Sequence, residues 1–487
     1  MFYMLQKVSF SLKYFKFLEK IYILKPYRNI IKGVFMQKRH VWSSSLTYIL
    51  TTAGATIGFG ATWRFPYLVG QNGGGAYVIT FIIAMLIVGI PMILVENVIG
   101  RRAHKNSLDA YDGYGSKFWK IVGILGLIGC FGIIGYYMVL GGWVITYIVN
   151  IFTGALNLAA PITKEMTSTF YNINIEHSPW MISLYTIIFI LINWFILAKG
   201  LSDGVERAMK FLMPLLFICL IAIVIRNVTL PGASEGIKFY LKPDFSKITP
   251  TLFIAVLGQV FFALSLGFGV MITLSSYLSK SENLLKTSVI TGIINTVVAL
   301  LAGFMIFPSL FSFGLAPDSG PKLVFEVLPI VFSHMHFGSV VAIFFFLLLI
   351  VAALTTSITL YEVLVTVVSE KLKMTRKKAS TIVLVVFFIL GNIPCILAYG
   401  PWASVRILGF NIFDAFDYIS GNIFFVVTAF GSAIFVGWVM KSVAKEELSN
   451  GLNGRYKWIV NIWYHYVKFI IPIIIFIIFI FGIKDLF

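Results

Sequence analysis

The chain has 487 residues, of which 59% are hydrophobic and only 12% are charged, and its formal net charge is +18. A soluble domain of this length could not cover its surface with so few charges, so the composition excludes that class and indicates a protein embedded in a lipid bilayer. Basic residues collect in the cytoplasmic loops of membrane proteins, and we therefore expect no nucleic-acid partner.

The first 39 residues form a basic and aromatic segment in which Glu19 is the only acid, and we expect it to lie in the cytoplasm. It shows no cleavable signal-peptide pattern. Two interpretations are open. In the first, translation starts at Met36, just before the first long apolar run. In the second, the segment forms an amphipathic helix on an anionic lipid surface.

Residues 40–487 contain recurring apolar runs near or above the roughly 20 residues that a bilayer-spanning helix needs. We predict a transporter domain of about eleven transmembrane helices, with one repeat over about 42–228, a second over about 251–441 and an extra helix over about 458–483. The predicted spans are 42–70, 76–99, 118–152, 180–198, 205–228, 251–278, 284–313, 337–372, 377–399, 413–441 and 458–483.

The loops between these spans alternate in charge. Lys164 is the only basic residue of the loop 153–177, whereas four other loops are strongly basic. The basic residues of those four loops are Arg101, Arg102, Lys105 and Lys117; Lys199, Arg207 and Lys210; Lys371, Lys373, Arg376, Lys377 and Lys378; and Lys441, Lys445, Arg455 and Lys457. The pattern predicts a multi-pass protein of the inner (cytoplasmic) membrane, with its N-terminus inside and its C-terminus outside.

Glycines interrupt the first and sixth predicted spans, where the tripeptide Gly-Phe-Gly occurs at 58–60 and again at 267–269. Spans one to five and spans six to ten would form two repeats. Because each repeat has an odd number of spans, the second repeat starts on the opposite side of the membrane and is inverted relative to the first. Broken helices at matching places in inverted repeats indicate a binding site at the membrane midplane. Freed carbonyls suit a bare cation and freed amides suit a carboxylate, a combination that a zwitterionic amino acid with sodium would satisfy. The predicted fold is an all-α polytopic membrane protein with an inverted five-plus-five repeat and an eleventh helix.

Several motifs in the interrupted helices and their neighbours occur together. They are WRFPY at 63–67, NGGGA at 72–76, GIP at 89–91 with Glu96, YY at 136–137, QVFF at 259–262, SLGFG at 265–269 and LTTS at 354–357. Over about residues 38–485 the chain thereby resembles the neurotransmitter:sodium symporters, including the bacterial leucine transporter. The family has the inverted five-plus-five fold.

The resemblance assigns a substrate site. The amine would meet the carbonyls of Thr56, Phe262 and Ala263 and the hydroxyl of Ser265. The carboxylate would meet the amides of Phe59 and Gly60 and the hydroxyl of Tyr137. The side-chain pocket would be lined by Ile133, Phe262, Phe268, Thr356 and Leu360. Gly58 stands where monoamine transporters of the family carry an aspartate, which implies an α-amino acid as substrate.

The family's second sodium site is complete in this sequence. Its expected ligands are the carbonyls of Gly54, Ile57 and Ala352 and the hydroxyls of Thr355 and Thr356. Such hard oxygen ligands suit a hard cation. The alternative is that the two threonines bond back to their own helix, as threonines often do.

The family's first sodium site is incomplete. Ala61 and Ala263 replace an asparagine and a threonine, while Asn295 and the carbonyls of Thr56 and Ala263 remain. Sodium without replacement oxygens is disfavoured in a low-dielectric site, although water or the hydroxyl of Thr56 or Thr62 could substitute. This departure predicts coupling to one sodium ion.

The family's chloride site is also missing. Phe81, Ala263 and Ala299 occupy its positions, and Ala299 is not the acid that chloride-independent members carry there, although Gln259 is retained. One cation fewer near the substrate requires no compensating negative charge. The sequence therefore predicts chloride-independent transport.

The resemblance also supplies two gates. Arg64 and Asp417 fit the outer pair that closes over the substrate, and charged pairs at this depth are usually functional. Arg39 and Glu370 fit the inner pair. Tyr277 and Glu362 are expected near the inner pair.

The predicted function is a symporter that imports a neutral amino acid by alternating access with one sodium ion and no chloride. No nucleophile-base constellation indicates an enzyme. Two alternatives keep the fold: a proton-coupled transporter that uses Glu362 or Glu96 as carrier, and a non-transporting amino acid sensor. The expected partners are the solute, sodium and the lipid bilayer, and the sequence leaves the oligomeric state open.

Overall fold

The computed structural model describes residues 41–317, 323–452 and 454–482. The basic segment 1–39, with the expected gate residue Arg39, lies outside these residues. Within the described part, nine helices are long and apolar enough to cross a membrane. All nine coincide with predicted spans to within a few residues, and the predicted spans without a continuous helix are the first and the sixth.

We number the spans 1 to 11 in chain order. The continuous ones are span 2, Gly75–Ala103, with α5 (Gly75–Ala84) and α6 (Ile90–Ala103); span 3, Lys117–Phe152, with α7 (Lys120–Phe152); span 4, α9 (Pro179–Leu197); span 5, Leu201–Val228, with α10 (Arg207–Val228); span 7, α14 (Leu284–Ser312); span 8, α16 (Gly338–Lys371); span 9, Arg376–Leu397, with α17 (Arg376–Phe387) and α18 (Ile393–Leu397); span 10, Ile412–Met440, with α19 (Ile412–Tyr418) and α20 (Phe425–Ile434); and span 11, Lys457–Gly482, with α22 (Lys457–His465) and α23 (Ile471–Gly482).

Spans 1 and 6 are each broken near the middle. Span 1 consists of α3 (Ser45–Thr56), a wide helical turn over Gly60–Arg64 and α4 (Phe65–Gln71), and span 6 consists of α12 (Pro250–Ala263) and α13 (Val270–Ser275). In span 6 the connecting backbone enters the left-handed region at Gly267 (φ +88°) and Gly269 (φ +76°), which glycine adopts at little cost. The inverted fold with two broken helices, predicted from paired glycines, is confirmed.

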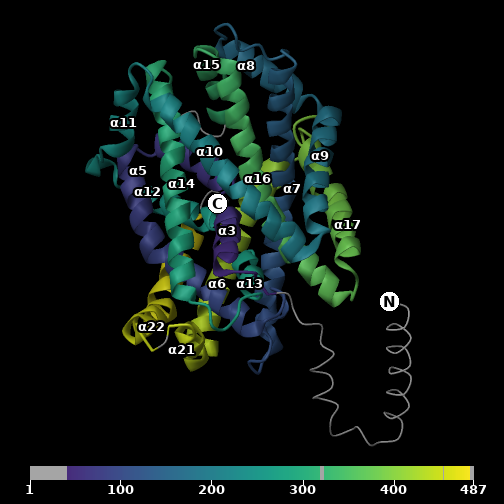
Figure 1. The fold of residues 1–487 in the computed structure, drawn as a ribbon, viewed down its shortest axis with the longest axis vertical. Helices are drawn as coiled ribbons and strands as arrows, with labels where there is room; N and C mark the ends of the chain where they lie inside the picture. The colour runs from purple at the N-terminus through teal and green to yellow at the C-terminus, as the bar shows by residue number, and fades with distance from the viewer. Residues whose placement is uncertain (1–40, 318–322, 453, 483–487) are drawn as a thin grey trace, which may run out of the picture. The chain divides into compact units, whose positions relative to one another are not determined.

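Four short helices that the sequence analysis did not predict lie in the loops. They are α8 (Lys164–Tyr171), α11 (Ala233–Leu241), α15 (Leu328–Ser333) and α21 (Ser442–Ser449). Figure 1 shows α8, α11 and α15 at one end of the bundle and α21 at the other. We call the end that carries α21 the basic end, because the basic loops recognised in the sequence, including the α6–α7 and α16–α17 connections, lie there.

The broken span 1 lies inside the bundle. Figure 1 shows α3 near its middle, and α3 packs against α10, α14 and α16. The long helix α16 also packs against α7 and α10. The break in span 1 is therefore surrounded by protein, which is the condition under which irregular backbone is tolerated at membrane depth.

A buried ion pair holds the basic end together. Arg101, in the last turn of α6, and Glu447, in α21, are both fully buried, with Nε and Oε1 2.6 Å apart. Arg101 also donates a hydrogen bond to the carbonyl of Glu282, in the loop between spans 6 and 7. The Glu282 carboxylate in turn accepts a hydrogen bond from Ser45 Oγ at the start of α3. One arginine thus connects spans 1 and 2, the loop before span 7, and α21.

We predict that Arg101→Met lowers the stability of the purified protein by about 3–5 kcal/mol, because it leaves the Glu447 carboxylate buried without its partner. The double variant Arg101→Met/Glu447→Leu removes both charges and should recover most of the loss. Thermal unfolding in detergent, followed by tryptophan fluorescence, measures both. Equal loss in the single and double variants would contradict the prediction.

Candidate functional site

The two helix breaks lie against each other and are joined by side chains. Gln259 Nε2, in α12, donates a hydrogen bond of 2.6 Å to the carbonyl of Gly60 in span 1. Ser265 Oγ, in the break of span 6, donates one of 3.0 Å to the carbonyl of Ala55 in α3. Both bonds run between spans 6 and 1, so the unwound segments form one unit.

Neighbouring spans supply further partners for the freed backbone groups. Glu96 Oε1, in span 2, accepts a hydrogen bond of 2.6 Å from the amide of Gly267. Tyr137 Oη, in span 3, accepts one of 3.2 Å from the amide of Phe59. Buried side chains thus replace the helical hydrogen bonds that the breaks remove.

A small cavity lies between the breaks. Ten of the eleven residues predicted for substrate binding line it, and the eleventh, Phe59, lines a larger cavity beside it. The ten are Thr56, Gly60, Ile133, Tyr137, Phe262, Ala263, Ser265, Phe268, Thr356 and Leu360. Its volume is about 20 Å³, which is room for about one water molecule. The surrounding aromatic rings therefore determine how much space a bound solute has.

Phe425 is a lining residue that the sequence analysis missed. It begins α20 in span 10, and its ring packs against that of Phe268. It lies in an apolar stretch of span 10 between Gly421 and Gly431, outside the motifs that carry the family resemblance, so nothing in the sequence marks it as a lining residue.

Gly58 lies beside two of the hydroxyl groups that line this cavity. A Cβ atom at this position would lie 2.3 Å from Tyr137 Oη and 2.4 Å from Thr356 Oγ1. A larger residue there would displace both hydroxyls, which is the physical reason for a glycine.

The five oxygens predicted for sodium form two hydrogen-bonded groups where α3 ends beside α16. Thr355 Oγ1 lies 2.9 Å from the carbonyl oxygen of Ala352 and 3.4 Å from that of Ile57. Thr356 Oγ1 lies 3.2 Å from the carbonyl oxygen of Gly54. Thr355 therefore bonds both to its own helix and across to span 1. The oxygen set suits a hard cation.

The position of the family's first sodium site is arranged differently. Asn295 Nδ2, in α14, donates to the carbonyl of Thr56 at 2.8 Å and approaches that of Ala263 at 3.5 Å. The hydroxyls of Thr56 and Thr62 donate to the carbonyls of Ala53 and Gly58 in their own helical turns. An amide N–H thus faces the carbonyls that a sodium ion would need.

Apolar groups fill the position of the family's chloride site. Ala299 and Phe81 are fully buried, and the Phe81 ring lies with its centroid 4.7 Å from that of Phe65. Gln259, the retained polar residue, directs its amide to Gly60.

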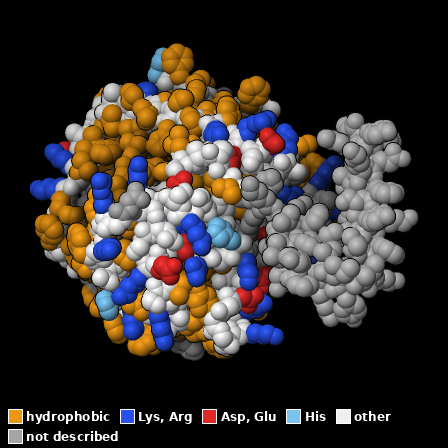
Figure 2. Space-filling model, turned by 60° about the horizontal axis from the view of Figure 1, so that its bottom comes forward, with side chains coloured by type: hydrophobic (Ala, Val, Ile, Leu, Met, Phe, Trp, Pro, Cys, Tyr) orange, Lys and Arg blue, Asp and Glu red, His pale blue; other side chains and the backbone are white. Residues whose placement is uncertain are grey.

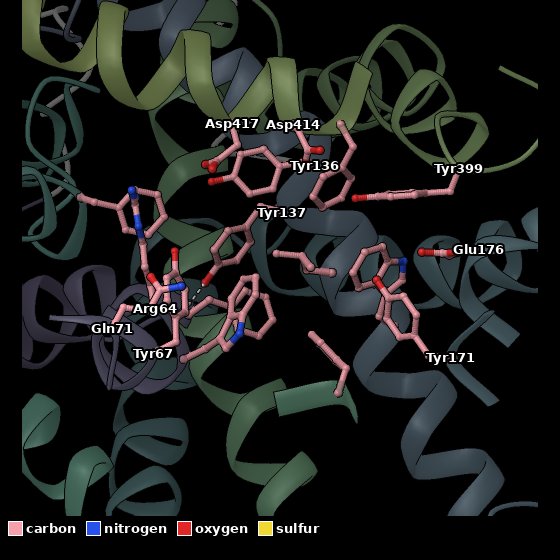
Figure 3. Close-up of a pocket in the computed structure, with 17 residues that line it drawn as sticks. Arg64, Tyr67, Gln71, Tyr136, Tyr137, Tyr171, Glu176, Tyr399, Asp414 and Asp417 are labelled. Atoms are coloured by element: carbon pink, nitrogen blue, oxygen red, sulfur yellow. Dashed lines mark hydrogen bonds between the residues drawn. The ribbon is translucent and has the colours of Figure 1, made fainter. Parts of the chain in front are cut away.

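A larger cavity of about 560 Å³ opens on the side of the breaks away from the basic end. Figure 3 shows Asp417, Asp414 and Tyr136 on one side of it and Arg64 on the other. Among the ion pairs of the described residues there is none between Arg64 and Asp417, and the Arg64 guanidinium lies 4.3 Å from the centroid of the Phe262 ring. The predicted outer pair therefore faces one cavity without closing it.

The rings of Phe262 and Tyr137 separate this outer cavity from the small one, since both residues line both cavities. A solute that passes from one to the other has to move past them. Acidic side chains at Glu176, Asp414 and Asp417 outnumber Arg64 in the outer cavity, which favours cations there.

The predicted inner gate residues Tyr277, Glu362 and Glu370 contact side chains from neighbouring segments. Tyr277 Oη donates to Glu362 Oε1 at 3.1 Å, and Glu362 Oε2 also pairs with Arg376 at the start of α17. Glu370 accepts a hydrogen bond of 2.7 Å from Asn106 in the loop after span 2. Arg376 and Asn106 were not predicted as gate residues, because a basic residue in a basic loop and an asparagine in a turn are both ordinary.

Hydrogen bonds hold the start of span 1 against spans 5 and 6 at the basic end. Trp42 Nε1 donates a hydrogen bond of 2.8 Å to the carbonyl of Leu274 in α13. Ser43 Oγ donates one of 2.6 Å to Glu206 Oε2 in span 5. The structure is therefore closed on the basic side of the small cavity and hollow on the other side.

Comparisons with known proteins agree with this geometry. The model of the sodium:neurotransmitter symporter family matches residues 39–175 and 164–486. An uncharacterized sodium-dependent transporter of Haemophilus influenzae is 62% identical over 451 residues, which cover 91% of this chain and 98% of the relative. The uncharacterized sodium-dependent transporter YhdH of Bacillus subtilis is 35% identical, with 91% of this chain and 97% of the relative covered.

The crystal structure of MhsT in complex with L-phenylalanine has the same fold, with a TM-score of 0.83 and 37% sequence identity over 91% of this chain and 100% of MhsT. The family resemblance recognised from the motifs is thus confirmed, and these relatives are transporters and not enzymes. The chain belongs to the sodium:neurotransmitter symporter family and is a sodium-dependent membrane transporter.

Proposed function

We propose that the protein imports a neutral α-amino acid by alternating access, with one sodium ion and no chloride. The basic end faces the cytoplasm of the inner membrane, in agreement with the charge of its loops. In this orientation the 560 Å³ cavity opens to the outside and the fastened end of span 1 closes the inside.

The observation that carries the proposal is the group of five oxygens shared by α3 and α16 next to the small cavity. Two hydroxyls of span 8 reach carbonyls at the end of α3, at 3.4 Å for Thr355 and 3.2 Å for Thr356. Thr356 also lines the small cavity. A cation held there would join span 1 to span 8 beside the solute, which is a physical basis for coupling their movements.

The polar groups of the small cavity support an α-amino acid as solute. Tyr137 accepts a hydrogen bond from the Phe59 amide, so its own proton is available to a carboxylate. Monoamine transporters of the family carry an aspartate at the position of Gly58, where it takes the place of a substrate carboxylate. In this chain the neighbouring hydroxyls leave no room for such a side chain. Apolar side chains, among them Phe262, Phe268 and Leu360, line much of the rest of the cavity. MhsT, which shares the fold, was solved with the neutral amino acid L-phenylalanine.

Proton coupling is the second candidate, but Glu362 and one carboxylate oxygen of Glu96 already make contacts within the fold. Glu362 is paired with Arg376, and Glu96 accepts a hydrogen bond from Gly267. Both carboxylates stabilise the fold in these contacts.

Uptake by proteoliposomes tests the proposal. Accumulation of a labelled neutral amino acid is expected when an inward sodium gradient is imposed. Accumulation driven by a proton gradient without sodium would favour the second candidate, and amino acid binding without accumulation would favour a sensor.

In the same assay, Thr355→Ala removes one sodium ligand. We expect the sodium concentration for half-maximal uptake to rise about fivefold or more, equivalent to about 1 kcal/mol. The control is Thr359→Ala, one turn further along α16, because Thr359 Oγ1 bonds back to the carbonyl of Thr356. An unchanged sodium requirement in a Thr355→Ala/Thr356→Ala double variant would exclude this sodium site.

Tyr137→Phe removes the proposed donor to the substrate carboxylate. Substrate binding should weaken by about 1–3 kcal/mol, or about 5- to 150-fold, because a buried charge loses a hydrogen bond. Scintillation proximity with labelled substrate measures the affinity. The control is Tyr147→Phe in the same helix, whose hydroxyl bonds the carbonyl of Phe325. Equal affinities for wild-type protein and Tyr137→Phe would contradict the placement of the carboxylate.

A further prediction concerns the number of sodium ions transported with each substrate molecule. Because the Asn295 amide already pairs with the carbonyl of Thr56, we expect one sodium ion per substrate in flux-ratio measurements, and full uptake when gluconate replaces chloride. Ala61→Asn/Ala263→Thr restores the family's two side-chain oxygens and should raise the ratio toward two. A ratio of two in the wild-type protein, or loss of uptake without chloride, would overturn this expectation.

A further inference from the structure

A third cavity lies at the basic end, apart from the two cavities along the proposed transport path. Its volume is about 380 Å³, within the range of small-molecule sites. The lining comes from the last turns of span 2, the loop that follows it, the end of span 10 and the start of α21. The lining residues are Ile99, Arg102, Ala103, Lys105, Ala110, Asp112, Gly113, Tyr114, Met440 and Val443.

The charges of this cavity leave two basic groups without close acidic partners. Asp112, its one acid, pairs with Lys120 at 3.1 Å. The carboxylate oxygen paired with Arg102 belongs to Glu447 and lies 3.9 Å away, and Arg101 already engages that carboxylate at 2.6 Å.

Lys105 forms no ion pair with any of the described residues. Arg102 and Lys105 therefore present positive charge to one hollow, and an anion would be stabilised there.

The cavity lies where two spans end. Ile99 belongs to the last turns of span 2, and Met440 is the last residue of span 10. Aromatic residues gather beside it: the ring of Phe435 lies 5.1 Å from that of lining residue Tyr114 and 5.5 Å from that of Trp119.

Large apolar side chains nearby remain exposed, with 66% of Phe118 and 48% of Trp438 accessible. Figure 2 turns the basic end toward the viewer and shows Lys and Arg side chains on a largely polar surface with hydrophobic side chains at its rim. Aromatic residues at the ends of spans are typical of the level of lipid headgroups.

We propose that this cavity binds the phosphate of an anionic glycerophospholipid. Arg102 donates to the phosphate oxygens and Lys105 adds a second charge, while Ile99 and Met440 contact the glycerol and the first carbons of the acyl chains. A free phosphate ion shares the charge chemistry and lacks the apolar part. The lipid is favoured because apolar and aromatic groups form much of the site and its surroundings. In the orientation proposed above, the lipid belongs to the cytoplasmic leaflet, where basic pockets between helices bind such headgroups.

Native mass spectrometry of the full-length protein in an uncharged detergent tests the proposal. The probes are dioctanoyl phosphatidylglycerol, dioctanoyl phosphatidylcholine, glycerol 3-phosphate and inorganic phosphate. We expect saturable binding of phosphatidylglycerol, which phosphatidylcholine competes for weakly. Arg102→Gln and Lys105→Gln should each weaken it about fivefold, as expected for one basic group near a lipid surface. Lys378→Gln, an exposed lysine of α17 at the same end, is the matched control.

The outcomes separate the sources of the phosphate. Binding of glycerol 3-phosphate or inorganic phosphate as tight as that of phosphatidylglycerol would assign the site to a soluble anion and overturn the lipid assignment. Equal binding in wild-type protein and in Lys105→Gln, or an equal loss in Lys378→Gln, would overturn the site itself. Melting temperature and size-exclusion profile confirm that each variant is folded, and Lys105→Gln keeps the test valid if Arg102→Gln fails to fold. Sodium-driven uptake is a separate readout, so failure of the lipid site and failure of the transport proposal are distinguishable.

Discussion

The structure depends on one constraint: a backbone amide or carbonyl inside a bilayer needs a hydrogen-bond partner. The breaks in spans 1 and 6 remove helical hydrogen bonds, and side chains from four spans supply the missing partners. Gln259 and Ser265 bond carbonyls of span 1, Asn295 bonds the carbonyl of Thr56, Glu96 accepts from Gly267, and Tyr137 accepts from the Phe59 amide. Side chains thus bond five backbone groups at or near the two breaks. These polar side chains are buried, and electrostatic interactions are strong in such an environment.

The same arrangement explains how ion and solute can act on one movement. The end of α3 faces the threonines of α16 on one side and the small cavity on the other. At the basic end, α3 begins with Trp42 and Ser43 bonded to spans 6 and 5. A ligand shifts an equilibrium only by its difference in affinity between two states. A sodium ion bound between spans 1 and 8 would have such a difference in affinity if the two spans move apart in the inward-open conformation.

Much of the fold was predictable, because hydropathy and loop charge report directly on membrane crossing. Paired glycines located both breaks, and the motifs located ten lining residues of the small cavity. The missed residues have no local signal. Phe425 is one aromatic in an apolar run, and Arg376 is one base in a basic loop. Each matters through a neighbour from another span, Phe268 and Glu362 respectively. A single sequence read along its length does not contain those pairings.

The buried pair at the basic end has a consequence for how the protein is made. Arg101 and Glu447 are 346 residues apart in the chain. At a synthesis rate of about 5–20 residues per second, Arg101 waits about 20–70 s for its partner to leave the ribosome. During that time its charge has to remain in the headgroup region or be shielded by the insertion machinery. The ion pair therefore forms only after α21 has been translated, when it joins the first repeat to the loop before the last helix.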